Sequence, residues 1–253
     1  MEFTKALIKG KLIKRYKRFF ADVKIGKEIV TAHCPNTGSM KGLLDEGNMV
    51  YVSKNDDPKR KLKYTLEIIK VKKNLVGVNT HFANKIAFHG LVNNLVKEVA
   101  NNDSIKAEVF FDKETRFDFL VEKNKQKIFV EVKNVTLFRE EKTAEFPDAV
   151  TTRGSKHLKT LIEAVKKGYK SYLLFLVQIE GVDNFKIAKD IDKEYYENYL
   201  LAKKAGVIFL AYQESLQLTF LPPSFFQIFL NNQSLIILIF FSILISFEFI
   251  LQR

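Results

Sequence analysis

Three charged residues stand inside two apolar stretches of this sequence, where uncharged side chains are the rule. Asp118 lies in "RFDFLVE", and Glu131 and Lys133 lie in "KIFVEVKNV". The polar "KNKQ" between the two stretches predicts a β-hairpin. Because strand side chains alternate between faces, Glu131 and Lys133 share a face with Phe129, and the Ile and Val residues between them take the other.

The turn sets the register of this hairpin. If it closes at residues 124–125, Glu122 pairs with Lys127, which is a favourable charge pair. In the same register Asp118 falls opposite Glu131. Two opposed carboxylates on a partly buried sheet repel each other, so this arrangement predicts a cation between them.

The predicted cation is Mg²⁺, with Mn²⁺ as an alternative, because both take carboxylate oxygens and water as ligands. Asp118 and Glu131 are the expected metal ligands. Lys133 can hold or polarise a water near the metal, or stabilise charge that develops on a phosphate oxygen. The three side chains together suit phosphodiester hydrolysis. An exposed hairpin face with solvated charges is the alternative that spacing alone leaves open.

A second group of polar residues begins the clearest predicted helix, "TTRGSKHLKTLIEAVKKG", which has threonines at its start and a glycine at its end. Its first turn carries Arg153, Lys156 and His157. Helix N-termini favour anions, so these side chains are expected to contact phosphate. An ordinary helix start is the alternative. His157 could also shuttle a proton, although such a histidine more often only makes hydrogen bonds.

The surrounding elements predict two domains. Residues 1–80 contain short β-favouring runs separated by Gly, Pro, Asn and Asp, which is typical of a small barrel. A helix over 85–101 and strands over 106–111, 115–122 and 127–137 follow. The capped helix then leads to the apolar strand "YKSYLLFLVQI", a helix over 192–204 and the strand "VIFLAY". This order indicates an α/β domain with a mixed sheet.

The charge of the chain favours a polyanionic partner. The net charge is +12 at pH 7, and 40 of the 41 Lys and Arg residues precede residue 205. DNA, RNA or an anionic membrane surface would fit, and a generally basic surface is the alternative. The single cysteine excludes an intrachain disulfide and, with a charged start that lacks an apolar leader, suggests a cytoplasmic protein.

Two stretches of the predicted barrel combine features of nucleic-acid surfaces. "KLIKRYKRFF" interleaves basic with aromatic residues, although its two phenylalanines could equally fill the barrel core. The loop "PKRK" is the better phosphate candidate. The residues expected to contact nucleic acid in these stretches are Lys14, Arg15, Lys17, Arg18, Lys59, Arg60 and Lys61.

The stretch "HCPNTGSM" contains a turn at Asn36 and Thr37 whose amides and hydroxyls could hold a phosphate. A purely structural turn is the equal alternative. His33 and Cys34 do not indicate zinc, because zinc sites need three or four ligands and this chain has one cysteine and four scattered histidines.

The chain resembles the sugar fermentation stimulation (SfsA) family. The matching stretches include "LIKRYKRFFADV", "TAHCPNTGSMKGLL", "RFDFLVE", "VEVKNVTL" and "FPDAVTTRGSKHL", in the right order over roughly residues 10–212. The resemblance implies an OB-fold barrel followed by a PD-(D/E)xK nuclease-like mixed sheet flanked by helices. On that pattern Asp118 and Glu131 are the two acids and Lys133 is the lysine. Family members are described as DNA-binding and linked to regulation of sugar metabolism genes, so a regulator that binds DNA without cutting it is the alternative.

The C-terminal tail departs from the family. Residues 205–252 contain no Lys or Arg, and the apolar run over 235–251 is shorter than the roughly 20 residues of a spanning helix. A membrane anchor and an altered reading frame after about Gln213 are the two interpretations. We favour the second and expect no membrane partner. The expected division is a barrel at 1–82, a nuclease-like domain at 83–212 and an atypical tail at 213–253.

Overall fold

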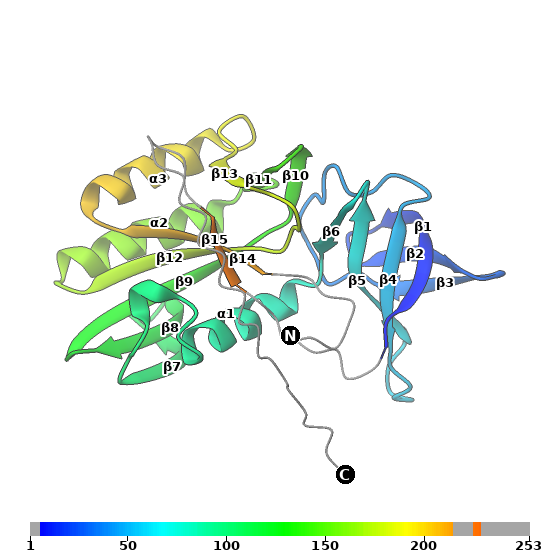
Figure 1. Ribbon diagram of the computed structural model, residues 1–253. Coiled ribbons are helices and arrows are strands. Elements are labelled where there is room, and N and C mark those ends of the chain that lie inside the picture. Colours follow the sequence, from blue (N-terminus) through cyan, green and yellow to red (C-terminus); the bar gives the residue numbers. More distant parts are fainter. Residues whose placement is uncertain (1–5, 215–224, 229–253) are drawn as a thin grey trace, which may run out of the picture.

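The β-favouring runs at the start of the chain form a closed barrel in the computed structural model, which describes residues 6–214 and 225–228 (Figure 1). The strand order is β3-β2-β1-β4-β5-β6, and a parallel β3–β5 pairing closes the barrel. This confirms the predicted OB-like barrel. The strands are β1 (Ile8–Tyr16), β2 (Phe20–Ile25), β3 (Glu28–His33), β4 (Met49–Lys54), β5 (Tyr64–Val71) and β6 (Asn74–Gly77).

The second domain is built on a six-stranded mixed sheet in the order β15-β14-β12-β9-β8-β7. The hairpin strands β7, β8 and β9 pair antiparallel, whereas β12 lies parallel to both β9 and β14. The predicted mixed sheet is therefore confirmed. The strands are β7 (Ser104–Phe110), β8 (Arg116–Lys123), β9 (Gln126–Val135), β12 (Lys170–Val177), β14 (Ile208–Glu214) and β15 (Phe225–Ile228).

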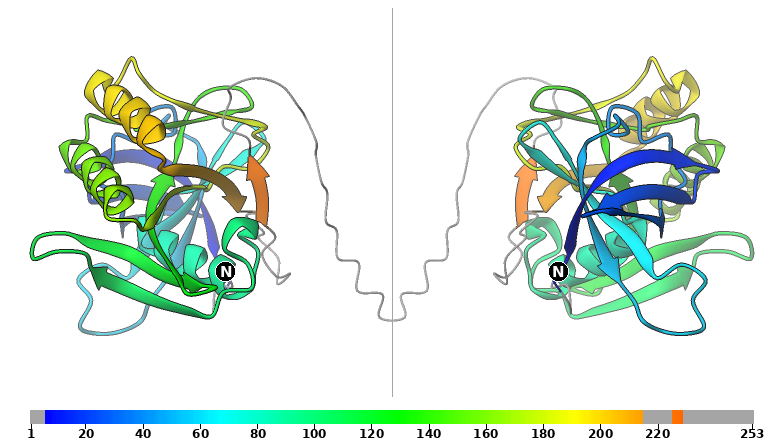
Figure 2. Two further views of the ribbon diagram at one scale, coloured as in Figure 1. Left: turned by 90° about the vertical axis from the view of Figure 1, so that its left-hand side faces the viewer. Right: turned by 90° about the vertical axis from the view of Figure 1, so that its right-hand side faces the viewer.

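Helices cover both faces of this sheet. The helices α2 (Thr152–Lys166) and α3 (Lys193–Ala205) lie side by side on one face, and α1 (Ala83–Val92) lies on the other (Figures 1 and 2). Phe129 of β9 joins the core under α2 and α3, whereas its neighbours Ile128 and Val130 pack with α1. The predicted alternation along this strand is therefore confirmed, and it directs Glu131 and Lys133 towards α2.

The helix boundaries follow local signals. The Thr151 side chain accepts a hydrogen bond from the Gly154 amide at 3.0 Å, so Thr151 caps α2, and Gly168 follows its end with a φ of +88°. The predicted helix over 85–101 is too long. The α1 helix stops at Val92 because Asn94 adopts a left-handed conformation, and a short 3-10 helix, η2 (Lys97–Val99), follows.

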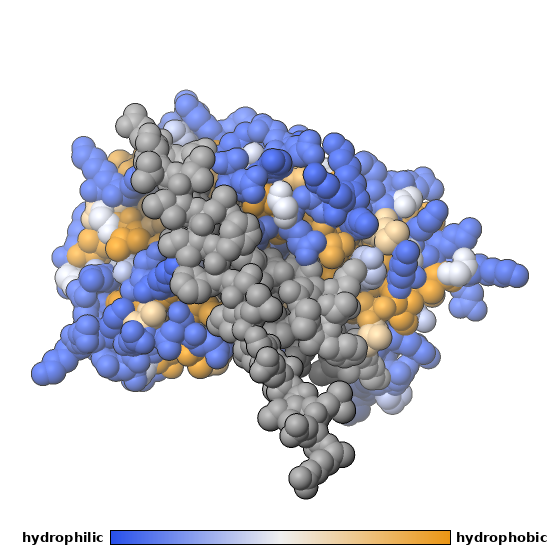
Figure 3. All heavy atoms as spheres, in the orientation of Figure 1, coloured by the Kyte–Doolittle hydropathy of each residue, from blue (hydrophilic) through white to orange (hydrophobic). Residues whose placement is uncertain are grey.

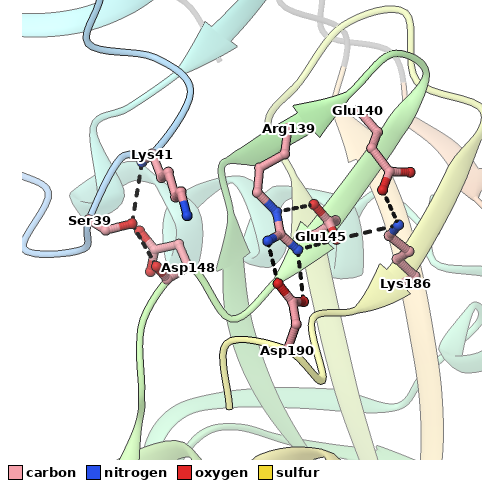
Figure 4. A network of polar contacts seen from close by, with 8 residues as sticks. All are labelled: Ser39, Lys41, Arg139, Glu140, Glu145, Asp148, Lys186 and Asp190. Carbon is pink, nitrogen blue, oxygen red and sulfur yellow. Dashed lines mark hydrogen bonds and ion pairs between the residues drawn. The ribbon is translucent and has the colours of Figure 1, made fainter. Parts of the chain in front are cut away.

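A second, three-stranded sheet went unpredicted. It consists of β10 (Leu137–Glu140), β11 (Thr143–Phe146) and β13 (Asn184–Ile187), in the order β10-β11-β13. Each strand has four residues, which is too short for alternation to stand out. The Arg139 guanidinium stabilises this sheet, since it binds both the buried Glu145 carboxylate and Asp190 (Figure 4).

The two domains share one hydrophobic core and several polar contacts. The Ser39 hydroxyl of the barrel donates to the Asp148 carbonyl at 2.6 Å (Figure 4). The Met40 amide donates to the Asp148 carboxylate at 3.2 Å. Gly38 allows this approach, because a Cβ there would lie 2.1 Å from Asp148 Oδ2. The loop before α2 is thereby fastened to the barrel.

The predicted tail lies mostly outside the described residues. Within the described part, β14 runs on to Glu214 and β15 adds to its edge antiparallel, so the sheet continues past the expected boundary at 212. Among the described helices, none has the length and apolar character that crossing a membrane requires. Hydrophilic side chains predominate over both domains on the face shown in Figure 3.

Candidate functional site

The hairpin of β8 and β9 has the register that the sequence predicts. Glu122 pairs with Lys127, and the backbone pairing of the two strands ends at Phe119 with Val130. Beyond that pair, the Val132 backbone amide donates to the Asp118 side-chain oxygen Oδ2 at 2.7 Å. The Asp118 side chain thus reaches across to β9, next to Glu131.

Helix α1 supplies a second partner for Asp118. The Asn84 amide nitrogen donates to Asp118 Oδ1 at 2.7 Å, from the first turn of the helix. Both carboxylate oxygens are therefore oriented by hydrogen bonds, one from each side. Asn84 was not predicted, because no spacing in the sequence relates a residue at 84 to one at 118.

Glu131 lies at the centre of a buried network with Lys133 and His157. Its side chain is 3% exposed, and those of Lys133 and His157 are 13% and 11% exposed. Lys133 Nζ lies 2.7 Å from Glu131 Oε1, and His157 Nδ1 contacts the same oxygen. The predicted first-turn histidine of α2 thus binds the second acid directly.

Arg153 contacts the second ring nitrogen of His157. The Arg153 Nε–H can only donate, and it lies 3.4 Å from His157 Nε2. His157 Nε2 therefore accepts, which leaves Nδ1–H to donate to Glu131. In this arrangement the 3.2 Å contact between Lys133 and His157 Nδ1 is not a hydrogen bond, because both groups carry protons.

The two acids have opposite electrostatic environments. Burial and then the neighbouring Glu131 carboxylate raise the pKa of Asp118 above its ordinary value. Burial alone would also raise the pKa of Glu131, but Lys133 and His157 outweigh it and hold that pKa below its ordinary value. Two interacting carboxyl groups with pKa values pushed apart are typical of sites that do acid–base or metal chemistry.

The donor set fits a hard divalent cation. Glu131 Oε2 is buried and has no hydrogen-bond partner within residues 6–214, so it is free to bind an ion. Two carboxylates with waters suffice for Mg²⁺ or Mn²⁺. Over the same residues, no group of three His, Cys, Asp or Glu side chains lies close enough together to bind a metal ion. Cys34 therefore belongs to no such group, and its sulfur contacts Met40 Sδ at 3.6 Å.

Two predicted nucleic-acid contacts, Arg15 and Asn36, make hydrogen bonds within the barrel domain. The Arg15 Nη2 donates to the carbonyls of Arg18, Asn36 and Gly38 at 2.9, 2.7 and 3.0 Å. The buried Asn36 side chain accepts from the Gly38 amide at 2.9 Å. Both side chains therefore shape the loop at 36–41, and contact with nucleic acid stays a prediction for them.

The other predicted contacts lie at or near the surface. Lys17 and Arg18 form the exposed β1–β2 turn, and Lys14 stacks over the Tyr16 ring at 5.5 Å. The remaining ones are the exposed Thr37, Lys59 and Lys61, the half-buried Arg60, and Lys156, which pairs with Glu114 at 3.2 Å. Of the predicted contacts, His157 reaches Glu131 directly and Arg153 reaches it through His157. Nucleic-acid contact by all of these residues stays a prediction.

The described architecture matches known families in both domains. Residues 13–78 match the family model described as SfsA N-terminal OB domain, and residues 81–219 match the one described as sugar fermentation stimulation protein RE domain. The chain belongs to the sugar fermentation stimulation protein family. The family resemblance drawn from the sequence is thereby confirmed.

Relatives in this family align over most of the chain. A sugar fermentation stimulation protein homolog from Marinomonas sp. is 44% identical over 216 residues, which cover 84% of each chain. A homolog from Desulfotalea psychrophila is 41% identical and covers 88% of this chain and 94% of its own. The solved structure of Pyrococcus furiosus SfsA in complex with Ca²⁺ is 28% identical, with a TM-score of 0.76 over 85% of this chain and 90% of that one.

Proposed function

We propose that this sugar fermentation stimulation protein binds nucleic acid, DNA first of all, and hydrolyses phosphodiester bonds with Mg²⁺ or Mn²⁺ at Asp118, Glu131 and Lys133. The observation that carries the proposal is the free, buried Oε2 of Glu131, a carboxylate close enough to Asp118 to raise the pKa of Asp118. A buried carboxylate oxygen without a partner is costly, and a cation removes that cost. The Ca²⁺ in the Pyrococcus furiosus relative supports a hard cation with oxygen ligands.

Asp118 and Glu131 would hold the cation. When bound, a divalent cation polarises a phosphoryl oxygen and increases the acidity of a bound water. The hydrogen bonds from Asn84 and Val132 fix the Asp118 carboxylate for this task, at 2.7 Å each. His157 holds one oxygen of Glu131 and leaves the other to the cation.

Lys133 would act on the reacting phosphate. Its ammonium group is held by Glu131 at the edge of the buried network and remains 13% exposed. From there it can donate to an attacking water or to a phosphate oxygen on which negative charge develops. Arg153 reaches solvent one helical turn before His157, where a guanidinium can bind a neighbouring phosphate.

The test is incubation of the purified full chain with end-labelled single- and double-stranded DNA and RNA. Parallel samples contain Mg²⁺, Mn²⁺ or a chelator. Cutting that needs the metal is the expected result. Binding of DNA without cutting in any sample would favour the non-catalytic regulator of sugar metabolism genes instead.

A further inference from the structure

A second cluster of basic side chains lies where the barrel meets α1. His33 ends β3, Arg60 lies in the β4–β5 loop, and His81 lies in the short 3-10 helix η1 (Thr80–Phe82). The His33 and His81 ring centroids are 6.3 Å apart. The Arg60 Nη2 donates to the Thr65 hydroxyl at 3.1 Å, and Thr65 is the strand partner of His33. The three basic groups thus converge, and His81 is exposed while the other two are half-buried.

A buried carboxyl group fixes the position of His81. Glu67 is 4% exposed, and it accepts hydrogen bonds from the Ser53 hydroxyl at 2.5 Å and the Asn79 amide nitrogen at 2.7 Å. The Asn79 side-chain oxygen in turn accepts from the His81 backbone amide at 3.1 Å and caps η1. These hydrogen bonds therefore fix the position of the backbone that carries the His81 imidazole.

The cluster adjoins the acids of the candidate site. His81 in η1 and Asn84 in α1 are three residues apart, and α1 follows η1 without a break, so the two side chains leave the chain on about the same side. Asn84 donates to Asp118. A chain of phosphates that places one group at Asp118 can therefore place another near His81.

We propose that His33, Arg60 and His81 form a phosphate subsite that binds the nucleic-acid backbone beside the phosphate held at Asp118 and Glu131. Guanidinium and imidazolium groups donate charge-assisted hydrogen bonds to phosphate oxygens. In this arrangement the barrel contributes His33 and Arg60 and the second domain contributes Asp118 and Glu131, so a bound strand would contact both domains. This inference rests on the proposed nucleic-acid binding.

The subsite makes binding depend on pH. Burial, and then His81 and Arg60, lower the pKa of His33 and so favour its neutral imidazole in the free protein. The charged groups that act on it are Arg60 from the β4–β5 loop and His81 from η1. Both also act on the carboxyl group of Glu67 in β5, whose pKa is raised by burial. A bound phosphate favours the imidazolium form, so binding takes up a proton and strengthens as the pH falls.

The test measures binding of a fluorescent 12-nucleotide oligothymidylate to the full chain at pH 6, 7 and 8, at constant ionic strength. A chelator is present, so cutting does not interfere. Affinity of the wild type should rise up to about tenfold per pH unit for each proton taken up. His33→Gln and His81→Gln should flatten this dependence. His89→Gln is the control, because it makes the same substitution at an exposed position of α1 outside the proposed subsite.

Each outcome bears on a different claim. Equal pH dependence in all three variants and the wild type would overturn the subsite and leave the proposed function in place. No binding by the wild type would contradict both. If His33→Gln or His81→Gln does not fold, the imidazole proton signals of the wild type replace the variants. The signals of His33 and His81 should shift when oligothymidylate is added while that of His89 stays unchanged, and the reverse would refute the subsite.

Discussion

Replacing Asp118 by Asn should abolish most of the stabilisation that a divalent cation gives this protein. Asn has the same shape as Asp and keeps one acceptor for the Val132 amide, whose bond to Asp118 is 2.7 Å long. Without metal, the loss of a charged hydrogen bond, about 1.5–3 kcal/mol, is partly offset by the end of repulsion with Glu131. The unfolding free energy of the metal-free variant should thus stay within about 2 kcal/mol of the wild type.

The metal-bound state should differ far more. At a Mg²⁺ concentration 100 times its dissociation constant, wild-type protein gains about 2.7 kcal/mol, since the cation binds only the folded state. For a domain of this size that gain raises the Tm by roughly 5–10 °C. Asp118→Asn removes one of two carboxylate ligands, so most of this rise should disappear.

The assay is thermal unfolding followed by circular dichroism, with Mg²⁺, Mn²⁺ or chelator. Asp45→Asn is the matched control, because it makes the same chemical change at an exposed position of the barrel. The control should keep the full metal-dependent rise in Tm. An equal rise in Asp118→Asn and Asp45→Asn would refute the assignment of Asp118 as a metal ligand.

Three further predictions follow from the domain contact, the basic loop and the buried acid. Gly38→Ala should lower the unfolding free energy by about 1–3 kcal/mol in urea titrations, because the added Cβ would lie 2.1 Å from Asp148 Oδ2. The loss should be smaller when Asp148 is also replaced by Ala, and an equal loss in that background would contradict this cause. Alanine at positions 59–61 should weaken binding to DNA of every sequence, and it should reduce the slope of log K against log salt concentration by up to about 2–3. An unchanged slope in fluorescence titrations would show that the loop does not contact DNA. Burial raises the pKa of Glu67 above its ordinary 4.5, so above pH 4.5 the folded state binds more protons than the unfolded state. The stability of the wild type should therefore fall, relative to Glu67→Gln, as the pH rises from 4.5 through the raised pKa. Parallel curves of stability against pH for the two proteins, measured by urea unfolding, would exclude this effect.

The hairpin could be predicted in detail because its determinants are local. The turn at residues 124–125 and the pair of Glu122 with Lys127 fix the register, and the register places Asp118 beside Glu131. Strand alternation then assigns faces without knowledge of the rest of the chain. The same local reasoning placed the α2 cap at one of the two threonines that begin the helix, and the structure shows Thr151, which needs only the amide of a residue three positions later.

Contacts between distant segments could not be predicted in this way. Asn84 meets Asp118 only because α1 packs on the sheet, and His157 meets Glu131 only because α2 packs on the opposite face. The basic residues of "KLIKRYKRFF" show the same limit. Composition marked Arg15 as a phosphate contact, whereas the barrel directs its guanidinium to three backbone carbonyls.

The most direct test of the central claim compares cleavage by the wild type with cleavage by Lys133→Ala, at saturating Mg²⁺. Lys133 acts on the reacting phosphate in this account, and Asp118 and Glu131 hold the cation. The variant should therefore keep the Mg²⁺-dependent rise in Tm and lose cleavage of labelled DNA by about 100-fold or more, the scale expected for a lost charge-stabilising donor. Metal-dependent cleavage that survives Lys133→Ala unchanged would contradict the assigned site.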